Sequence, residues 1–285
     1  MIDFKKLARQ ISLVENHHAD AQKLLLELQY NSDIPIIGIT GPPGAGKSTL
    51  INALLKIALD QGNKLGVIAV DPSSPFTQGA LLGDRLRMKQ YYTHPSLYIR
   101  SLATRGSLGG LNDKIIEICD VMRSYAFDYI IIETVGVGQS EVEIAGLADV
   151  TTVVLVPEAG DEIQYMKSGL MEIADIFVLN KSDRPDADIF YGQLHKELHE
   201  RSQSQIAIYK TQAHNNIGIL EWWDEIQVKT KTTNNKNKNL SLARKAFLLI
   251  QSYRMKDITI DLILDKINFE SEKPFHLYQF VNKLR

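Results

Sequence analysis

The sequence predicts an α/β fold, in which a mostly parallel central sheet is flanked by helices and helical extensions lie at both ends. Three features predict it. Short apolar runs of strand length recur along the chain, amphipathic helical patterns separate them, and polar or glycine-rich segments follow several of the runs. In open sheets of this kind, ligands bind beyond the carboxyl ends of the strands, so the polar segments are where function is expected.

Composition limits the classes of protein and partner. A chain of 285 residues, 44% of them apolar, forms one large domain with appendages or two small ones. Its formal net charge of −2 gives no overall field favouring nucleic acid or an anionic membrane. Cys119 is the single cysteine, which rules out a disulfide within the chain and fits a reducing compartment. Neither a signal peptide nor an apolar run of roughly 20 residues is visible, so we expect a cytoplasmic protein.

Residues 1–33 are expected to form an N-terminal helical extension. Apolar residues at helical spacing over residues 4–14 and 24–28 predict two helices. The pair His17-His18 between them has no second cluster of metal ligands nearby, so a surface turn is favoured over a metal site.

Residues 36–49 carry the motif around which the chain is organised. An apolar strand pattern leads into a full G-x-x-x-x-G-K-[ST] match, and an amphipathic helix follows, which is the context that a P-loop requires. Backbone amides of such a loop wrap a phosphate, the lysine reaches the outer phosphates, and the serine hydroxyl can ligate Mg²⁺. The motif predicts a P-loop NTPase. Its expected nucleotide-binding residues are Gly41, Pro42, Pro43, Gly44, Ala45, Gly46, Lys47, Ser48 and Thr49.

The second strand pattern, over residues 65–70, ends at Asp71, whose carboxylate is well placed to meet Mg²⁺ or its waters. Long polar loops follow at residues 72–85 and, after a third strand, at 104–110. Long loops in a compact domain are usually functional or disordered, and we favour nucleotide-responsive switch segments.

A buried strand over residues 129–133 ends in Glu133 and is soon followed by Gly136. Apolar residues before an acid are typical of a Walker B element, in which the acid holds Mg²⁺ through water and the glycine amide senses the γ-phosphate. Ras-like proteins place a glutamine after this glycine to orient the attacking water, but Val137 stands there. We therefore expect slow intrinsic hydrolysis, unless a partner or Gln139 supplies the missing group. The expected metal ligands are Ser48, Asp71 and Glu133.

A later strand, over residues 176–179, ends in the N-K-x-D element at residues 180–183, which selects guanine. The Asp183 carboxylate accepts hydrogen bonds from N1–H and the exocyclic amine of guanine, and adenine cannot offer these donors. Asn180 can brace the base and the phosphate loop. A backbone contact to the base is expected near Ala213, although Gln212 departs from the usual serine. The predicted ligand is GTP or GDP, held at the base by Asn180, Lys181, Asp183 and Ala213.

Residues 229–239 are rich in lysine and asparagine, which predicts a flexible linker between a P-loop domain at 34–228 and a C-terminal helical segment at 240–285. Beyond the linker, helical patterns occur over residues 242–250 and from Pro274 onward. Packing on a partner subunit and packing back on its own domain both fit these patterns.

These segments together resemble the MeaB/ArgK/MMAA family of P-loop GTPases, metallochaperones for the adenosylcobalamin-dependent methylmalonyl-CoA mutase. The resemblance covers roughly residues 9–220. It rests on matched motifs in the same order, at residues 12–16, 41–48, 70–75, 79–85, 100–101, 105–111, 133–141 and 180–183.

The resemblance implies that Lys47 and Ser48 handle phosphate and Mg²⁺, with Asp71, Asp84 and Glu133 around the metal and the switches. It also implies a further switch near residues 161–167, which relays the nucleotide state to the mutase, and a homodimer paired through the C-terminal segment. That segment is the poorest match. The expected catalytic residues are Lys47, Asp71, Asp84, Glu133, Gly136 and Gln139.

Three functions remain open at this point. The favoured one is a GTPase chaperone for a cobalamin-dependent acyl-CoA mutase. The second is a metal-insertion GTPase for another metalloenzyme, against which the single cysteine and the scattered histidines count. The third is an ArgK-like transport-associated ATPase or kinase, against which the guanine element counts.

Overall fold

The chain divides into two compact units, Met1–Asn235 and Lys236–Arg285. The computed structural model describes residues 2–71, 91, 93–104, 111–135, 140–157, 169–201, 203, 205–232, 235–255, 257–269 and 277–284. The first unit contains the sheet, and the second consists of helices.

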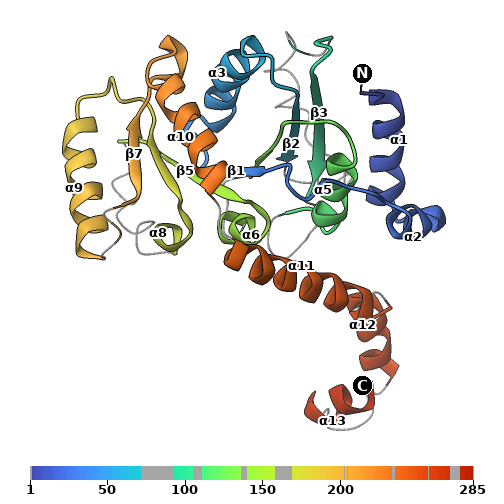
Figure 1. The fold of residues 1–285 in the computed structure, drawn as a ribbon. Helices are drawn as coiled ribbons and strands as arrows, with labels where there is room; N and C mark the ends of the chain where they lie inside the picture. Colours follow the sequence, from blue (N-terminus) through green and yellow to red (C-terminus); the bar gives the residue numbers. More distant parts are fainter. Residues whose placement is uncertain are drawn as a thin grey trace. The chain divides into compact units, whose positions relative to one another are not determined.

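A central sheet forms the framework of the first unit, and the strands of it that the structure describes all pair in parallel (Figure 1). Their order is β3-β2-β4-β1-β5-β6-β7, which places β1 between β4 and β5. The predicted α/β fold of a P-loop NTPase is therefore confirmed. The strands are β1 (Ile36–Thr40), β2 (Leu65–Asp71), β3 (Leu97–Ala103), β4 (Tyr129–Glu133), β5 (Val150–Leu155), β6 (Ile176–Leu179) and β7 (Ala207–Lys210).

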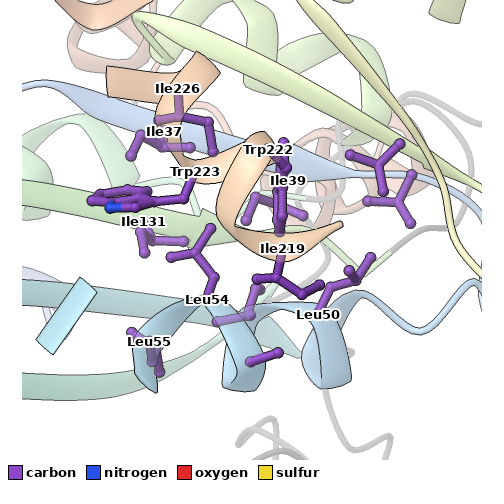
Figure 2. Packing of buried hydrophobic residues seen from close by; sticks show 14 of the residues in the cluster. Ile37, Ile39, Leu50, Leu54, Leu55, Ile131, Ile219, Trp222, Trp223 and Ile226 are labelled. Atoms are coloured by element: carbon purple, nitrogen blue, oxygen red, sulfur yellow. The ribbon is translucent and has the colours of Figure 1, made fainter. Parts of the chain in front are cut away.

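Helices cover both faces of this sheet. On one face, α3 (Lys47–Asp60) and α10 (Ile219–Thr232) pack on the strands, with Trp222 and Trp223 fully buried between helix and sheet (Figure 2). The other face is covered by α1 (Phe4–Glu15), α5 (Ile115–Arg123), α6 (Ser140–Leu147), α8 (Leu170–Ile173) and α9 (Ala187–Glu200). Every residue of β1 is buried because both faces of the sheet are covered. This burial explains the apolar run that predicted the strand.

Both predicted N-terminal helices are present, as α1 (Phe4–Glu15) and α2 (Ala19–Leu26), with His17 and His18 in an exposed turn between them. α1 packs on α5 (Ile115–Arg123), and its apolar side chains lie in the same cluster as those of α5. Arg100 of β3 pairs with Glu15 of α1. The N-terminal helices are thus integrated into the sheet unit.

Three aspartates each fix the beginning of a strand. The Oδ2 atom of Asp149, just before β5, accepts a hydrogen bond from Ile36 N–H of β1 at 2.7 Å. Asp175, just before β6, accepts one from Thr151 N–H of β5 at 2.7 Å, and Asp128, before β4, accepts one from Lys64 N–H at 2.7 Å. Each carboxylate accepts a hydrogen bond from a backbone amide at the amino ends of the strands, opposite the phosphate loop, where strand pairing no longer provides a partner.

Asp175 makes the stability of the protein depend on pH. Burial raises the pKa of its carboxyl, and the hydrogen bond from Thr151 N–H and the charge of Lys229 only partly oppose this. Since the folded pKa exceeds the unfolded value of about 3.9, the unfolded chain loses the proton first, and the free energy of unfolding falls as pH rises through the folded pKa.

We expect Asp175→Asn, which keeps an acceptor for Thr151 N–H but carries no charge, to flatten this decline. Urea unfolding measured from about pH 4 to pH 7 tests it. The matched control is Asp128→Asn, because Asp128 makes the same bond from an exposed position and its replacement is expected to keep the wild-type slope. Parallel curves for Asp175→Asn and the wild type would contradict the assignment.

The C-terminal unit departs from prediction. Residues 229–239 were expected to form a flexible linker, but α10 continues to Thr232 and α11 (Asn235–Met255) begins three residues later. No helix was predicted here, because asparagine and threonine, which are poor helix formers, make up most of this stretch. α12 (Ile260–Phe269), whose first turn is capped by Thr259 Oγ1, was not predicted, whereas α13 (Leu277–Leu284) matches the pattern that follows Pro274.

Many apolar side chains of the C-terminal unit are exposed. On α11 they are Leu242, Phe247, Leu248, Ile250, Tyr253 and Met255. None of the helices in the described parts of the chain combines the length and the apolar character needed to cross a membrane.

Candidate nucleotide-binding site

The phosphate loop connects the end of β1 to the start of α3, and close packing demands glycine at two of its positions. Gly41 has φ +138°, and a Cβ there would lie 2.1 Å from the carbonyl oxygen of Val154. Gly46 has φ +88°, and a Cβ there would lie 2.5 Å from Nδ2 of Asn180. Any side chain at either position would therefore displace the loop from β5 or from Asn180.

Lys47 is folded back over this loop. Its Nζ donates hydrogen bonds to the carbonyl oxygens of Gly41 at 2.7 Å and Pro42 at 2.9 Å, and the side chain is buried. No side chain caps the N-terminus of α3. The loop thus combines a buried ammonium group with the uncapped amides of a helix start, an arrangement suited to the phosphates of a nucleotide.

Three side chains bring oxygen atoms to the carboxyl ends of β2 and β4, beside the loop. Ser48 Oγ donates to Glu133 Oε1 at 2.6 Å, and both side chains are buried. Asp71, also buried, ends β2, in which Ala69 pairs with Glu133 of β4, so the two carboxylates lie at the same edge of adjacent strands. Two carboxylates and a hydroxyl are the hard ligands that Mg²⁺ prefers, and the donor set fits this ion.

Asn180 connects three segments through one amide. Its Nδ2 donates to the carbonyl oxygen of Ala45 in the phosphate loop at 2.8 Å. Its Oδ1 accepts hydrogen bonds from Thr211 Oγ1 at 3.2 Å and from Ala213 N–H at 3.3 Å. The hydrogen bond to Ala45 is the bracing of the phosphate loop expected from the sequence, and the Asn180 side chain is buried from solvent.

Asp183 lies three residues beyond Asn180 and is exposed, so its carboxylate is accessible to a ligand. The backbone between them turns sharply, since Lys181 has φ +55°. Ser182 N–H donates to the Thr211 carbonyl oxygen at 3.0 Å, which fixes this turn against the segment carrying Ala213.

The structure therefore brings together most of the predicted site. Residues 41–49, Asp71, Glu133, residues 180–183 and Ala213 all lie at the carboxyl ends of the strands. Asp84, Gly136, Gln139 and the switch expected near residues 161–167 lie outside the described residues.

Two contributors were missed by sequence reasoning. Thr211 binds Asn180, and Thr134 Oγ1 donates to Thr40 Oγ1 at 2.9 Å, which joins the ends of β4 and β1. In the sequence, each of these threonines is marked only by its place directly after a strand pattern, and the structure shows that both are buried.

Comparison with known proteins agrees with this geometry. The family model of the methylmalonyl-CoA mutase-associated GTPase MeaB matches residues 7–268. A Pyrococcus abyssi protein named as a GTPase is 48% identical over 232 residues, which cover 79% of this chain and 72% of that protein. The mitochondrial methylmalonic aciduria type A homolog of Mus musculus is 38% identical over 245 residues, covering 78% of this chain and 59% of that protein.

Solved structures support the fold. A crystal structure described as an LAO/AO transport system kinase has a TM-score of 0.67 and 24% identity, covering 99% of this chain and 92% of that one. HypB from Helicobacter pylori in complex with nickel has a TM-score of 0.53 and 16% identity, covering 79% of this chain and 95% of HypB. At these identities the likeness concerns the fold alone. The match along nearly the whole chain and the identities to the named relatives show that the chain belongs to the MeaB family of GTPases, which bind guanine nucleotide and hydrolyse GTP.

Proposed function

We propose that this GTPase acts as a chaperone for a cobalamin-dependent acyl-CoA mutase, such as methylmalonyl-CoA mutase. The observation that carries the proposal is the family match over residues 7–268, because the family is described by its association with that mutase. The name of the mouse relative, a methylmalonic aciduria type A homolog, points to the same metabolic step.

In this proposal, residues 41–49 bind the phosphates of GTP, and Asn180, Lys181, Asp183 and Ala213 bind the guanine base. Ser48 would be a direct ligand of Mg²⁺, and Asp71 and Glu133 would hold the ion or its waters; a bound ion would supply charge neutralisation at the phosphates. The buried contacts around Lys47, Ser48 and Asn180 support these roles, because they hold donor groups in place before a ligand arrives.

Hydrolysis is then an in-line attack of water on the γ-phosphate, promoted mainly by positioning and charge neutralisation. Lys47 holds its positive charge at the phosphates, and Asp84, Gly136 and Gln139 are proposed to complete the site. The apolar Val137 cannot orient water, so the intrinsic rate is slow and the partner accelerates it. GTP orders the segments around residues 71–85 and 133–141, and GDP releases them.

We further propose a homodimer that pairs through the C-terminal unit. The exposed apolar side chains of α11 support it, since a second copy would remove them from water.

Turnover of GTP by the purified protein tests the proposed function. We expect slow turnover alone, a clear rise when a cobalamin-dependent mutase from the same organism is added, and no turnover of ATP. Lys47→Ala in the same mixture is the control for contaminating hydrolases, because activity above about one hundredth of the wild-type rate would come from elsewhere. Turnover of GTP that does not respond to the mutase would contradict the chaperone role and favour metal insertion into another enzyme.

A further inference from the structure

A pocket of about 260 Å³ lies beside the phosphate loop. One wall is a side of α3, where four lining residues are spaced by three and four positions. The second wall is η2 (Ala213–Asn215), which packs on α3, and the third is Tyr91, whose Oη donates to the carbonyl oxygen of Asn52 at 3.3 Å. The described lining residues are Thr49, Asn52, Ala53, Lys56, Tyr91, Ala213, His214 and Asn216.

Two residues that line the pocket, Thr49 and Ala213, also belong to the proposed nucleotide site. Thr49 follows Ser48 directly, and Ala213 donates its N–H to Asn180 Oδ1 at 3.3 Å. If a nucleotide has its phosphates on residues 41–48 and its base at Asn180 and Asp183, its ribose lies between them, near Thr49 and Ala213 of the pocket lining. This step rests on the proposed function, because it takes the ligand and its orientation from there.

The chemistry of the lining favours an anion. Its described lining residues include one lysine, Lys56, and no carboxylate, and the other polar side chains there belong to threonine, asparagine, tyrosine and histidine residues. Lys56 is exposed and forms no ion pair with any residue that the structure describes. A positive charge in a concave site that holds no acid attracts a negative group of the ligand.

The volume of the pocket and the position of Lys56 indicate which part of the nucleotide the pocket binds. The volume is below the roughly 300–1,000 Å³ of pockets that enclose whole ligands, so it suits one part of a nucleotide. Lys56 follows Thr49 by seven residues, which places its Cα about 10 Å further along the helix. The lysine is therefore directed to a group beyond the ribose, on the side away from the 5′-phosphates.

We propose that this pocket binds the ribose of a guanine nucleotide together with a phosphate group esterified to its 2′ or 3′ oxygen, and that Lys56 selects for that phosphate. The ligands are guanosine 5′-diphosphates that carry additional phosphate on the sugar. They occupy the same site as GTP but present no γ-phosphate for hydrolysis. They therefore act as competitive regulators of the GTPase.

Calorimetric titration of the full chain with three probes tests this proposal: GDP, GDP carrying a 3′-diphosphate, and GDP carrying a 2′-phosphate. We expect the wild type to bind at least one sugar-phosphorylated probe about tenfold more tightly than GDP, because a charge-assisted contact is added. Lys56→Gln is expected to abolish that preference. The matched control is Lys196→Gln on α9, where the lysine is also exposed, and it is expected to keep the preference.

Three results would overturn the proposal. If neither sugar-phosphorylated probe binds more tightly than GDP, the pocket does not hold the phosphate. If Lys56→Gln and Lys196→Gln keep the same preference, Lys56 does not select it. If GDP itself fails to bind, the nucleotide site on which the proposal rests is wrong. The titration of the wild type with GDP alone distinguishes this outcome from the other two.

Discussion

Replacing Lys47 by alanine is expected to lower the kcat for GTP about 100- to 1,000-fold, the loss typical when one fixed electrostatic group is removed from a transition state. Lys47 is buried, and its ammonium lies on the loop expected to hold the phosphates. The charge that develops on the transferred phosphoryl group would lose a cation that the phosphate loop holds in place. Single-turnover assays with saturating GTP separate this loss from weaker binding.

A second substitution separates the charge of Lys47 from its structural bonds. Lys47 also donates to the carbonyl oxygens of Gly41 and Pro42, so alanine is expected to loosen the loop as well. Lys47→Gln keeps an N–H donor but no charge. Equal losses in both variants, with the thermal midpoint of the glutamine variant near that of the wild type, would assign the effect to charge. Near-normal turnover in Lys47→Gln would contradict it.

Replacing Asp183 by asparagine is expected to weaken binding of GDP about 100-fold and to strengthen binding of xanthosine diphosphate. The aspartate accepts from two donors of guanine, and hydrogen bonds to a charged group are worth roughly 1.5–3 kcal/mol each. Asparagine offers one acceptor and one donor, which suits xanthine, because xanthine carries a carbonyl oxygen where guanine carries its amine. Titrations with both diphosphates measure the change.

The neighbouring Asp186 offers a matched control. It is exposed and its side chain makes no capping bond at the start of α9, so Asp186→Asn alters the same charge nearby without touching the base. We expect it to bind both nucleotides as the wild type does. If Asp183→Asn also discriminated as the wild type does, Asp183 would not be the residue that selects guanine.

The phosphate loop and the N-K-x-D element could be predicted because each is contiguous and follows a strand. What could not be predicted is how they connect. The sequence predicted that Asn180 braces the phosphate loop, but not that its amide also binds the segment of Ala213. The order of strands, with β1 beside β5 and β5 beside β6, brings these segments together.

The same limit applies to the aspartates at the strand beginnings. Each of Asp128, Asp149 and Asp175 precedes an apolar strand, a repeated pattern that is visible in the sequence. Each carboxylate, however, binds an amide at the start of a different strand, Lys64, Ile36 or Thr151, so its role depends on topology. For the predicted linker, the boundary between the two units falls within residues 229–239, but the helices that extend into this stretch were not foreseen, because asparagine and threonine are poor helix formers.

The amide of Asn180 also constrains how this sequence can vary. Because one side chain serves the phosphate loop and the segment at Thr211 and Ala213, substitutions in any of these segments are felt by the others. A base-recognition segment transplanted from another nucleotide-binding protein would bring its own spacing and break this shared geometry. Engineering of base preference in this chain is therefore best confined to exposed Asp183, while Asn180, Ala45, Thr211 and Ala213 are best left unchanged.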